Sequence, residues 1–273
     1  MKRFILATVL AILSCSLCPA RKAEVKVMSF NIRHTGEKKD TGVKNWKARR
    51  EAVVNMIRTE QPDVIGMQEV RADQKDYLIL GLPEYQPVMH SPSNTKFIMF
   101  RRDRFQLLDQ GNFWLSETPD KPSKGWRSSS ERATLWAKLK DKRTGKVFWF
   151  FDTHLDVSSY EARIKGAEMC NDRMKEICGK KGVQFLVGDM NSLEPDCLLV
   201  LRDYLRDARL ESPETDNRPT FSGFGFCPPH VTYAHDHIFY LNAQPLRFRL
   251  LDGKDYGVEY ISDHYPIMFT AKF

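Results

Sequence analysis

Acidic, amide and imidazole side chains stand at the edges of several apolar runs of this sequence. Those that share this position are Asn31, Glu69, His154, Asp189, Asn191, Asp236, Asp263 and His264. A polar group at the end of a buried strand is held rigidly and still meets the edge of the sheet, where α/β enzymes place their chemistry. Each residue alone is more often a turn former, a helix cap or a solvated charge. The prediction of an active site therefore depends on the whole set.

This set favours hydrolysis of phosphate esters assisted by a hard metal ion. The carboxylates of Glu69, Asp263 and Asp189 suit Mg²⁺, which takes few protein ligands and keeps several waters. Asparagine and histidine could hold a phosphoryl oxygen or the leaving group, and an aspartate could align a water as the nucleophile. Other catalytic signatures are missing from the sequence: it has no Gly-x-Ser-x-Gly and no P-loop, and Gly223-x-Gly225 lacks a third glycine.

A second candidate metal site combines soft and borderline ligands late in the chain. Its members are Cys227, His230, His235 and His237. All are residue types that bind zinc. On a strand, however, His235 and His237 would share one face and Asp236 would take the other, and the spacing matches no usual zinc motif. Zinc at residues 227–237 stays open as an alternative.

Strand-like and helix-like segments alternate along the chain and would position these residues. Apolar periodicity predicts strands at 24–32, 63–68, 96–101, 105–113, 133–139, 146–153, 183–187, 231–241 and 267–273, and helices at 46–58 and 160–178. Pro62 is expected to stop the first helix, and Pro195 suits the first turn of a third. The chain is therefore predicted to be mixed α/β.

Two features of this pattern bear on tertiary structure. The segments 96–101 and 105–113 are expected to pair across a polar turn, as are the next two strands. The longest irregular stretches are residues 116–132 and 211–230, and loops of that length in a compact domain often carry function. No linker or repeat divides the chain, so we predict a single domain over residues 21–273.

The composition is that of an ordinary globular protein. The chain has 273 residues, 42% of them hydrophobic and 28% charged, which excludes collagen-like and wholly disordered chains. No stretch reaches 18 apolar residues, so we expect no integral membrane span. Losing Lys2 and Arg3 with a leader would reduce the formal charge from +7 to +5. This mild positive charge suits an anionic substrate without requiring one.

The first twenty residues have the pattern of an export signal. Two basic residues precede an apolar run at 4–13, and small residues allow cleavage after Ala20. We therefore predict residues 1–20 to be a signal peptide and the protein to be periplasmic or secreted. Lipid anchoring at Cys15 or Cys18 is the alternative, although Leu13 is large for its place in such a signal.

The cysteines beyond the leader are Cys170, Cys178, Cys197 and Cys227. Cys170 and Cys178 lie eight residues apart in one predicted helix, about 12 Å along its axis, so they cannot form a disulfide while that helix is intact. Export permits disulfides, and a bond between Cys197 and Cys227 stays open. Buried free thiols are the expectation.

Six short motifs together resemble the endonuclease/exonuclease/phosphatase superfamily, the fold of pancreatic deoxyribonuclease, deadenylases and bacterial sphingomyelinases. In order they are Ser29-Phe30-Asn31, Gln68-Glu69, Thr153-His154-Leu155, Gly188-Asp189-Met190-Asn191, Asp236-His237-Ile238-Phe239 and Ser262-Asp263-His264-Tyr265-Pro266. The resemblance covers about residues 24–273. It implies a four-layer α/β/β/α sandwich of two packed mixed β-sheets with helices outside. The segment 113–119, followed by Gly125-Trp126, is similar to a bacterial subgroup nearest the deadenylase-like members.

The resemblance also implies a metal side of the site. Glu69 would be the principal ligand of Mg²⁺, with Mn²⁺ as the alternative ion. Asn31 would lie beside it and help to place metal and phosphate. Asp263 would support the metal side.

The same resemblance implies roles for the remaining residues. Asp189 would orient or deprotonate the attacking water, and Asn191 would hold the scissile phosphate. His154 and His264 would contact phosphate oxygens, with Asp236 orienting His264.

Two further residues are candidates for contact with the substrate. Arg163 resembles a helix arginine near the site in some branches, and an ordinary surface charge explains it equally well. Trp126, with Trp114 and Phe224, could form an aromatic rim that stacks a base or sugar, although such residues are more often part of a core.

We therefore predict a Mg²⁺-dependent hydrolase of phosphate esters, of the phosphodiesterase or nuclease type, that attacks phosphorus with an activated water. The alternative is an exported phosphatase, or an enzyme like phospholipase C or sphingomyelinase that acts on small or lipid phosphates. A second alternative is a module that binds a phosphate ligand without turnover. The substrate would be a nucleic acid, a phospholipid or a sugar phosphate, and we expect a monomer.

Overall fold

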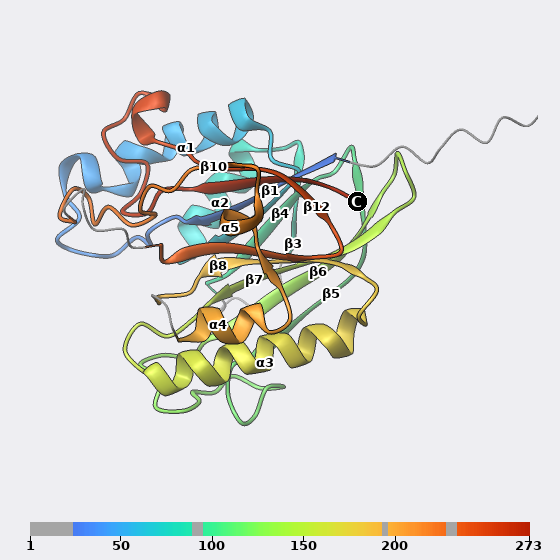
Figure 1. Cartoon of the computed structure of the whole chain (residues 1–273). Helices are drawn as coiled ribbons and strands as arrows, with labels where there is room; N and C mark the ends of the chain where they lie inside the picture. Colours follow the sequence, from blue (N-terminus) through green and yellow to red (C-terminus); the bar gives the residue numbers. More distant parts are fainter. Residues whose placement is uncertain (1–23, 89–94, 193–195, 228–233) are drawn as a thin grey trace, which may run out of the picture.

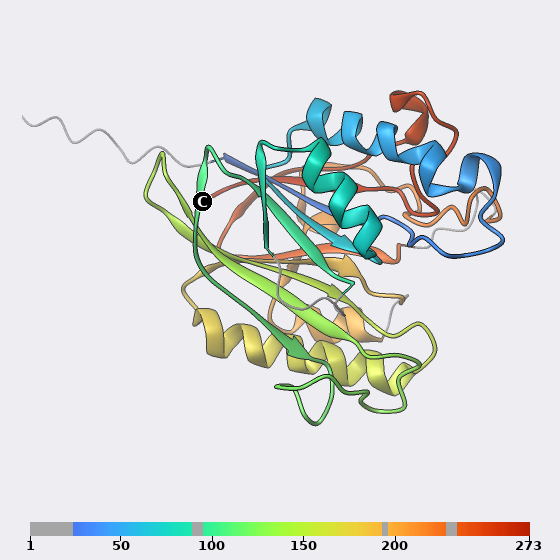
Figure 2. The ribbon, with the colours of Figure 1, turned by 180° about the vertical axis from the view of Figure 1, so that it is seen from behind.

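A computed structural model describes residues 24–88, 95–192, 196–227 and 234–273 of the chain. Two β-sheets lie face to face, and helices cover the outer face of each sheet (Figure 1). From behind, α1 and α2 are seen along the first sheet, and α3 lies along the second (Figure 2). The four-layer sandwich implied by the motifs is confirmed.

The first sheet has seven strands and the second has six. In spatial order, the first contains β10 (Glu214–Thr215), β12 (Gln244–Leu250), β13 (Ile267–Lys272), β1 (Glu24–Asn31), β2 (Val64–Gln68), β4 (Phe97–Arg101) and β3 (Tyr85–Val88). The second contains β5 (Phe105–Trp114), β6 (Ala133–Asp141), β7 (Val147–His154), β8 (Val183–Asp189), β11 (Asp236–Leu241) and β9 (Arg206–Asp207). Both sheets are mixed, because β1 runs parallel to β2 and β7 runs parallel to β8, while their other neighbours are antiparallel.

The helices are short except for two. They are α1 (Trp46–Glu60), α2 (Ala72–Gly81), α3 (Tyr160–Cys178), α4 (Cys197–Arg202) and α5 (Ala208–Glu211), with 3₁₀ turns η1 (Gly42–Lys44) and η2 (Gly253–Tyr256). The Asn45 side chain accepts the Lys47 N–H at the start of α1, and the Ser159 side chain accepts the Ala162 N–H at the start of α3. Such caps satisfy backbone donors that the helix itself leaves free.

Three apolar layers hold the sandwich together. Strand β1 is buried on both faces. Val25 and Val27 pack between the sheets, while Met28 and Phe30 belong to the layer beneath α1. The third layer joins the second sheet to α3 and α4, where Phe151 contributes from β7. Alternation of side chains along a strand produces this division, and a strand buried on both faces has the near-continuous apolar run seen in the sequence.

One predicted strand pairing is wrong. The segments β4 and β5 do not form a hairpin, because β4 pairs with β2 and β3 in the first sheet and β5 pairs with β6 in the second. The turn between them carries Arg104, which forms ion pairs with Asp63 at 2.7 Å and Asp141 at 2.9 Å. Asp63 precedes β2 and Asp141 ends β6, so this buried cation fixes the point where the chain changes sheets. The hairpin of β6 and β7 forms as predicted.

Other elements were not predicted or differ at their ends. The apolar pattern did not predict α2, β3 or β12. Helix α1 extends to Glu60, with Gln61 in the left-handed conformation at φ 47°. Part of the predicted strand 231–241 and all of Pro195 lie outside the described residues. Cys170, Cys178, Cys197 and Cys227 are free thiols, as expected, although Cys178 and Cys227 are only half-buried.

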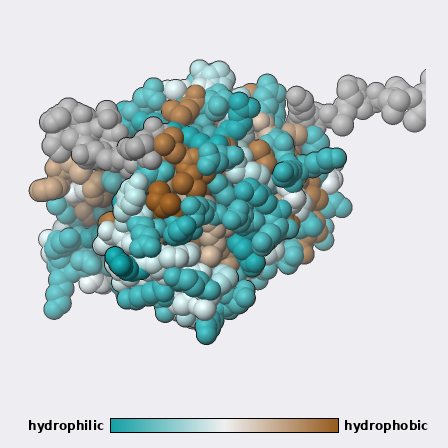
Figure 3. All heavy atoms as spheres, turned by 60° about the horizontal axis from the view of Figure 1, so that its bottom comes forward, coloured by the Kyte–Doolittle hydropathy of each residue, from teal (hydrophilic) through white to brown (hydrophobic). Residues whose placement is uncertain are grey.

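The surface is largely polar. The face drawn in Figure 3 is mostly hydrophilic, with apolar side chains gathered in small patches. Within the described part of the chain, the helices are too short or too polar to cross a membrane.

Candidate active site

Strand ends from both sheets bring the predicted polar residues together. Asn31 ends β1 beside Gln68, the last residue of β2. In the second sheet, Asp189 ends β8 between His154 of β7 and Asp236 of β11, its cross-strand neighbours. Parallel strands end at the same edge of a sheet, and the two packed sheets present these edges at one end of the sandwich. The structure therefore brings these strand-end residues together at one end of the sandwich.

A cavity of about 530 Å³ opens at this edge. Six predicted residues line it: Glu69, His154, Asp189, Asn191, Asp263 and His264. Asn31 and Asp236 are buried and contact the lining residues by hydrogen bonds.

Asp189 lies at the centre of the buried polar network. One of its carboxylate oxygens accepts the Asn31 side-chain N–H at 2.9 Å, and the other accepts the Asn191 backbone N–H at 2.9 Å. The imidazole nitrogens of His154 and His264 lie 3.5 and 3.7 Å from it. Burial raises the pKa of Asp189 to about 7, against the opposing effect of the His264 cation. A carboxylate with such a pKa can accept a proton at neutral pH.

His264 and Asp236 form a buried ion pair. The Nδ1 of His264 lies 2.8 Å from Oδ2 of Asp236. Burial alone would lower the pKa of His264, but the carboxylates of Asp236 and Asp189 outweigh it and raise the pKa to about 10. The imidazole is therefore protonated at neutral pH and can donate a hydrogen bond from Nε2 toward the cavity.

The pKa of His154 is shifted in the opposite direction to that of His264. Burial, assisted by the nearby Arg132 cation, lowers the pKa of His154 well below its usual range. The Nε2 of this neutral imidazole lies 2.9 Å from Nδ2 of Asn191, and the same amide donates to the Leu155 carbonyl at 3.1 Å. Asn191 has a φ of 49°, a left-handed conformation that non-glycine residues adopt mainly where the surroundings impose it.

Glu69 is held by the first sheet on the other wall of the cavity. It follows β2 with a φ of 64°, and its carboxylate accepts the His34 backbone N–H at 3.2 Å and the Asn31 amide at 3.3 Å. Beneath it, Gln68 donates to Asp152 of β7 at 2.6 Å, so the support of Glu69 spans both sheets. The positive φ of Glu69 is a backbone strain that is typical of residues whose orientation serves a function.

The oxygen donors on this wall fit a hard divalent cation. Glu69 and Asp263 line the cavity with carboxylates, and Asn31 adds an amide beside Glu69. Carboxylate and amide oxygens are the ligands that Mg²⁺ and Mn²⁺ prefer. Asp189, Asp236 and His264 also have ligand atoms within 4.8 Å of one another. Because His264 is protonated at neutral pH, its ring is suited to donating hydrogen bonds rather than to ligating a cation.

The zinc alternative finds no support among the described residues. Both ring nitrogens of His237 are occupied: Nδ1 lies 3.1 Å from Asp207 Oδ2, and Nε2 lies 2.8 Å from the Ala234 carbonyl. Across the described ranges, no group of three histidine, cysteine or acidic ligands includes Cys227 or His235. His230 lies outside the described residues.

Arg163 and Trp126 do not line the cavity. The guanidinium of Arg163 lies 3.3 Å from Asp196 and donates to the Asp156 carbonyl at 3.1 Å. Trp126 packs against the apolar layer under α3, and its carbonyl accepts the Ser159 hydroxyl at 2.8 Å. Contact of either residue with a substrate stays a prediction.

Eight of the fourteen lining residues were missed by sequence reasoning, and three of them contact residues of the site or its border. Arg33 lies 3.6 Å from Asp263 and forms a 2.8 Å ion pair with Asp40. Arg132 pairs with Asp156 at 3.2 Å, and the Phe221 ring lies 4.8 Å from the His264 ring, centroid to centroid. Arg132 and Phe221 fall within the two long irregular stretches, and that length was their only signal.

Comparison with known proteins agrees with this geometry. Residues 28–264 match the model of the Endonuclease/Exonuclease/phosphatase family. An endonuclease/exonuclease/phosphatase from Bacteroides vulgatus is 29% identical, with a TM-score of 0.84 over 92% of this chain and 99% of that one. A family protein from Bacteroides thetaiotaomicron is 26% identical, with a TM-score of 0.85 over 93% and 99%. A mannosyl-6-phosphatase from the same species is 28% identical, with a TM-score of 0.82 over 91% and 100%.

Proposed function

Because the chain belongs to the endonuclease/exonuclease/phosphatase family and is therefore a hydrolase of phosphate esters, we propose that it is a Mg²⁺-dependent enzyme that uses Asp189 to activate water. The observation that carries the proposal is the position of the Asn31 amide. Its Nδ2 lies 2.9 Å from Asp189 and 3.3 Å from Glu69. One amide thus joins the candidate base to the candidate metal ligand, and the cavity extends over both.

The residues of the cavity have complementary chemistry for attack on phosphorus. Asp189 accepts the proton of the attacking water. Its raised pKa makes the carboxylate a stronger base, and a substantial fraction of it is still deprotonated near neutral pH. His264, held protonated by Asp236, donates to an oxygen of the phosphoryl group as negative charge develops there. His154 and Asn191, whose side chains lie 2.9 Å apart beside Asp189, would contact the phosphate as well.

Glu69, Asn31 and Asp263 would hold the metal ion, with Mn²⁺ able to replace Mg²⁺. A bound divalent cation supplies positive charge to the phosphate and withdraws electron density from phosphorus. The chain adds its own cations, because Arg33, Arg71, Arg132 and His264 line the same cavity as Glu69, Asp189 and Asp263. This balance favours a doubly charged phosphate.

The substrate class follows from that charge and from the size of the cavity. About 530 Å³ is the scale of a small-molecule site, so we propose a small phosphate monoester such as a sugar phosphate as the first candidate. The mannosyl-6-phosphatase that this chain resembles is a precedent within the family. A phosphodiesterase of the nuclease type is the second candidate, favoured by the Phe221 ring on the cavity wall, which could stack a base.

A panel of substrates tests this proposal. Purified protein would be assayed with sugar phosphates, p-nitrophenyl phosphate, bis-p-nitrophenyl phosphate and oligonucleotides, each with Mg²⁺, Mn²⁺ or EDTA. Metal-dependent release of phosphate from the monoesters, lost in Asp189→Asn, is the expected result. Turnover of diesters or oligonucleotides alone would favour the second candidate. Turnover that EDTA leaves unchanged would contradict the metal-dependent mechanism.

We also propose that the protein is exported. The basic start and the apolar run at residues 4–13 support this. Mass spectrometry of the protein purified from its host would give a first residue of Arg21 for a cleaved form, or a lipid mass on Cys15 or Cys18 for an anchored form. An intact Met1 in the cytoplasm would contradict export.

A further inference from the structure

A second and larger cavity, of about 930 Å³, lies at the opposite end of the sandwich. It is bordered by Glu24, where β1 begins, and by the turn between β6 and β7. Asn31 of the active site ends the same strand, seven residues later, so the two cavities are about 23 Å apart along β1. No residue lines both.

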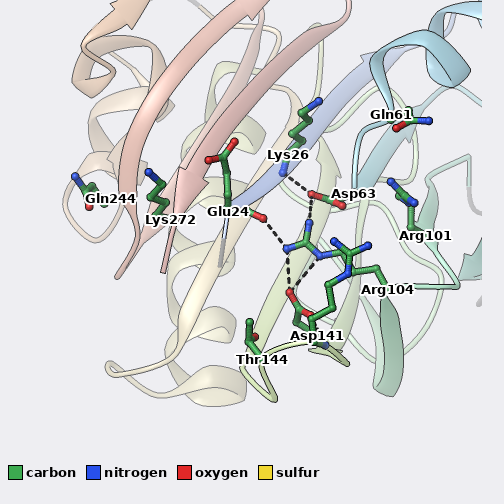
Figure 4. A pocket seen from close by; sticks show the side chains of 11 residues that line it. Glu24, Lys26, Gln61, Asp63, Arg101, Arg104, Asp141, Thr144, Gln244 and Lys272 are labelled. Atoms are coloured by element: carbon green, nitrogen blue, oxygen red, sulfur yellow. Dashed lines mark hydrogen bonds and ion pairs between the residues drawn. The ribbon is translucent and has the colours of Figure 1, made fainter. Parts of the chain in front are cut away.

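Two acidic side chains at the base of this cavity share one buried cation. Figure 4 shows Arg104 between Asp63 and Asp141, bonded to both. Asp63 also accepts the Lys26 backbone N–H at 2.9 Å, and Arg104 donates to the Glu24 carbonyl. The single guanidinium thus offsets one of the two negative charges, and the remainder has to be counted against the other cations that line the cavity.

Cations at the rim are not neutralised in the same way. In the described part of the chain, Lys26, Arg143 and Lys272 have no carboxylate within ion-pair distance, although the Lys26 ammonium donates to the Glu60 carbonyl at 3.3 Å. Arg101 pairs with the exposed Asp103. Glu24 is the only rim carboxylate among the lining residues outside the Arg104 network, and it stands opposite Lys272 in the β1–β13 register. Among all the lining side chains, five cations face three carboxylates. Positive charge therefore exceeds negative charge around an open cavity large enough for a small molecule.

We propose that this cavity is a second anion site, which binds a phosphate-bearing ligand remote from the active site. Arg143 supplies a planar guanidinium that can pair with two phosphate oxygens at once, and Lys26 and Lys272 add point charges from the adjacent strands β1 and β13. Several cations spread around one cavity favour a ligand with more than one charge. The phosphate belongs either to a soluble compound or to a lipid headgroup, since both offer the same oxygens.

The test maps binding by residue, which separates this site from the active site. Sodium tripolyphosphate would be titrated into ¹⁵N-labelled protein in EDTA, at constant ionic strength, while amide shifts are followed by NMR. Shifts at Lys26, Arg143 and Lys272 are expected, together with at least a tenfold loss of affinity in R143Q/K272Q. The matched control is K38Q/K39Q, which removes two exposed lysines that line neither cavity and should change affinity less than twofold.

A variant that is expected to bind tripolyphosphate more tightly separates an effect on the site from a loss of folding. Glu24→Gln removes the rim carboxylate and should tighten tripolyphosphate binding by about two- to fivefold, a gain that misfolding cannot produce. Sedimentation with vesicles of phosphatidylcholine, with and without phosphatidylglycerol, identifies the source: binding to anionic vesicles that R143Q/K272Q loses indicates a headgroup, and its absence indicates a soluble ligand. Shifts confined to the active site, or equal binding by R143Q/K272Q and the wild type, would overturn the proposal.

Discussion

The Nδ1 atom of His264 lies 2.8 Å from Oδ2 of Asp236, and the pair is buried beside Asp189 at the junction of the two sheets. Because the two carboxylates raise the pKa of His264 to about 10, the imidazolium and the Asp189 carboxylate coexist only within a limited pH range. Its lower limit is set by Asp189, whose pKa is about 7. The proposed mechanism needs Asp189 deprotonated and His264 protonated, so the pH dependence of the rate tests both assignments.

We predict that kcat/KM rises with pH through about 7, as Asp189 loses its proton, and falls through about 10, as His264 loses its proton. Asp236→Asn removes the carboxylate that contacts the imidazolium and should move the upper limb to lower pH by about one unit or more. The lower limb should remain. A pH–rate series on the wild type and this variant would measure both limbs, and an unchanged upper limb in Asp236→Asn would show that His264 is not the group responsible.

The same pairing has a consequence for stability. The folded-state pKa of His264 is raised above its unfolded value near 6.5, so the protonated pair stabilises the fold fully below pH 6.5. This contribution is lost as the pH rises through about 10. Urea unfolding of the wild type should therefore show a midpoint that falls between pH 7 and pH 10, and the fall should be smaller in Asp236→Asn. An equal fall in both proteins would argue against the pair as its cause.

Asp189→Asn is predicted to lower kcat by about 10²–10⁴-fold, the usual contribution of a general base. The fold should be retained, because burial already disfavours the charged form of this carboxylate and the amide is nearly isosteric. Steady-state kinetics and a thermal melt check the two halves of the prediction. Asp203→Asn, an exposed carboxylate outside the cavity, is the control and should keep full activity. A variant at Asp189 with more than a tenth of wild-type kcat would exclude it as the base.

Removal of metal should abolish turnover, and Mg²⁺ or Mn²⁺ should restore it. Glu69→Gln is expected to raise the metal concentration needed for half-maximal activity by about 100-fold, at the upper end of the roughly 10–100-fold cost of losing a supporting residue. Activity measured against metal concentration gives this number directly. Glu51→Gln on the exposed face of α1 is the matched control. If the two variants required the same metal concentration, Glu69 would not be the principal ligand.

The candidate site residues could be placed at strand ends from the sequence because their signal is local. A polar residue at the end of a buried apolar run marks a strand end, and Asn31, Glu69, His154 and Asp189 each have that pattern. Their convergence came from the resemblance of motif order to a known family. Phe221 had no comparable signal, because its contact with His264 joins residues that are distant in the chain.

The elements that were missed lack a regular apolar face or are decided by tertiary contacts. In α2 the buried residues are Gln74 and Leu78, while Leu80 is 82% exposed, so no amphipathic period appears. The hairpin of β4 and β5 was predicted wrongly because two strands joined by a polar turn have the same sequence pattern whether they pair with each other or enter different sheets. What separates them is Arg104, whose partners lie 41 and 37 residues away.

Arg104 gives the last prediction. Its guanidinium joins Asp63 of the first sheet to Asp141 of the second at 2.7 and 2.9 Å, and both carboxylates are buried. Arg104→Met keeps much of the apolar volume but leaves two buried carboxylates without their cation. Breaking a buried ion pair by removing one partner costs about 3–5 kcal/mol.

Urea unfolding should therefore show Arg104→Met to be less stable than the wild type by about that amount. The control Arg101→Ala breaks only the ion pair with Asp103, whose side chain is 54% exposed, and should cost about 1 kcal/mol or less. Because Arg104 is remote from the active site, kcat/KM per folded molecule should not change. A loss of activity at unchanged stability would mean that this end of the sandwich is coupled to the catalytic cavity. Equal stability of the two variants would mean that the ion pairs of Arg104 do not contribute to the free energy of unfolding.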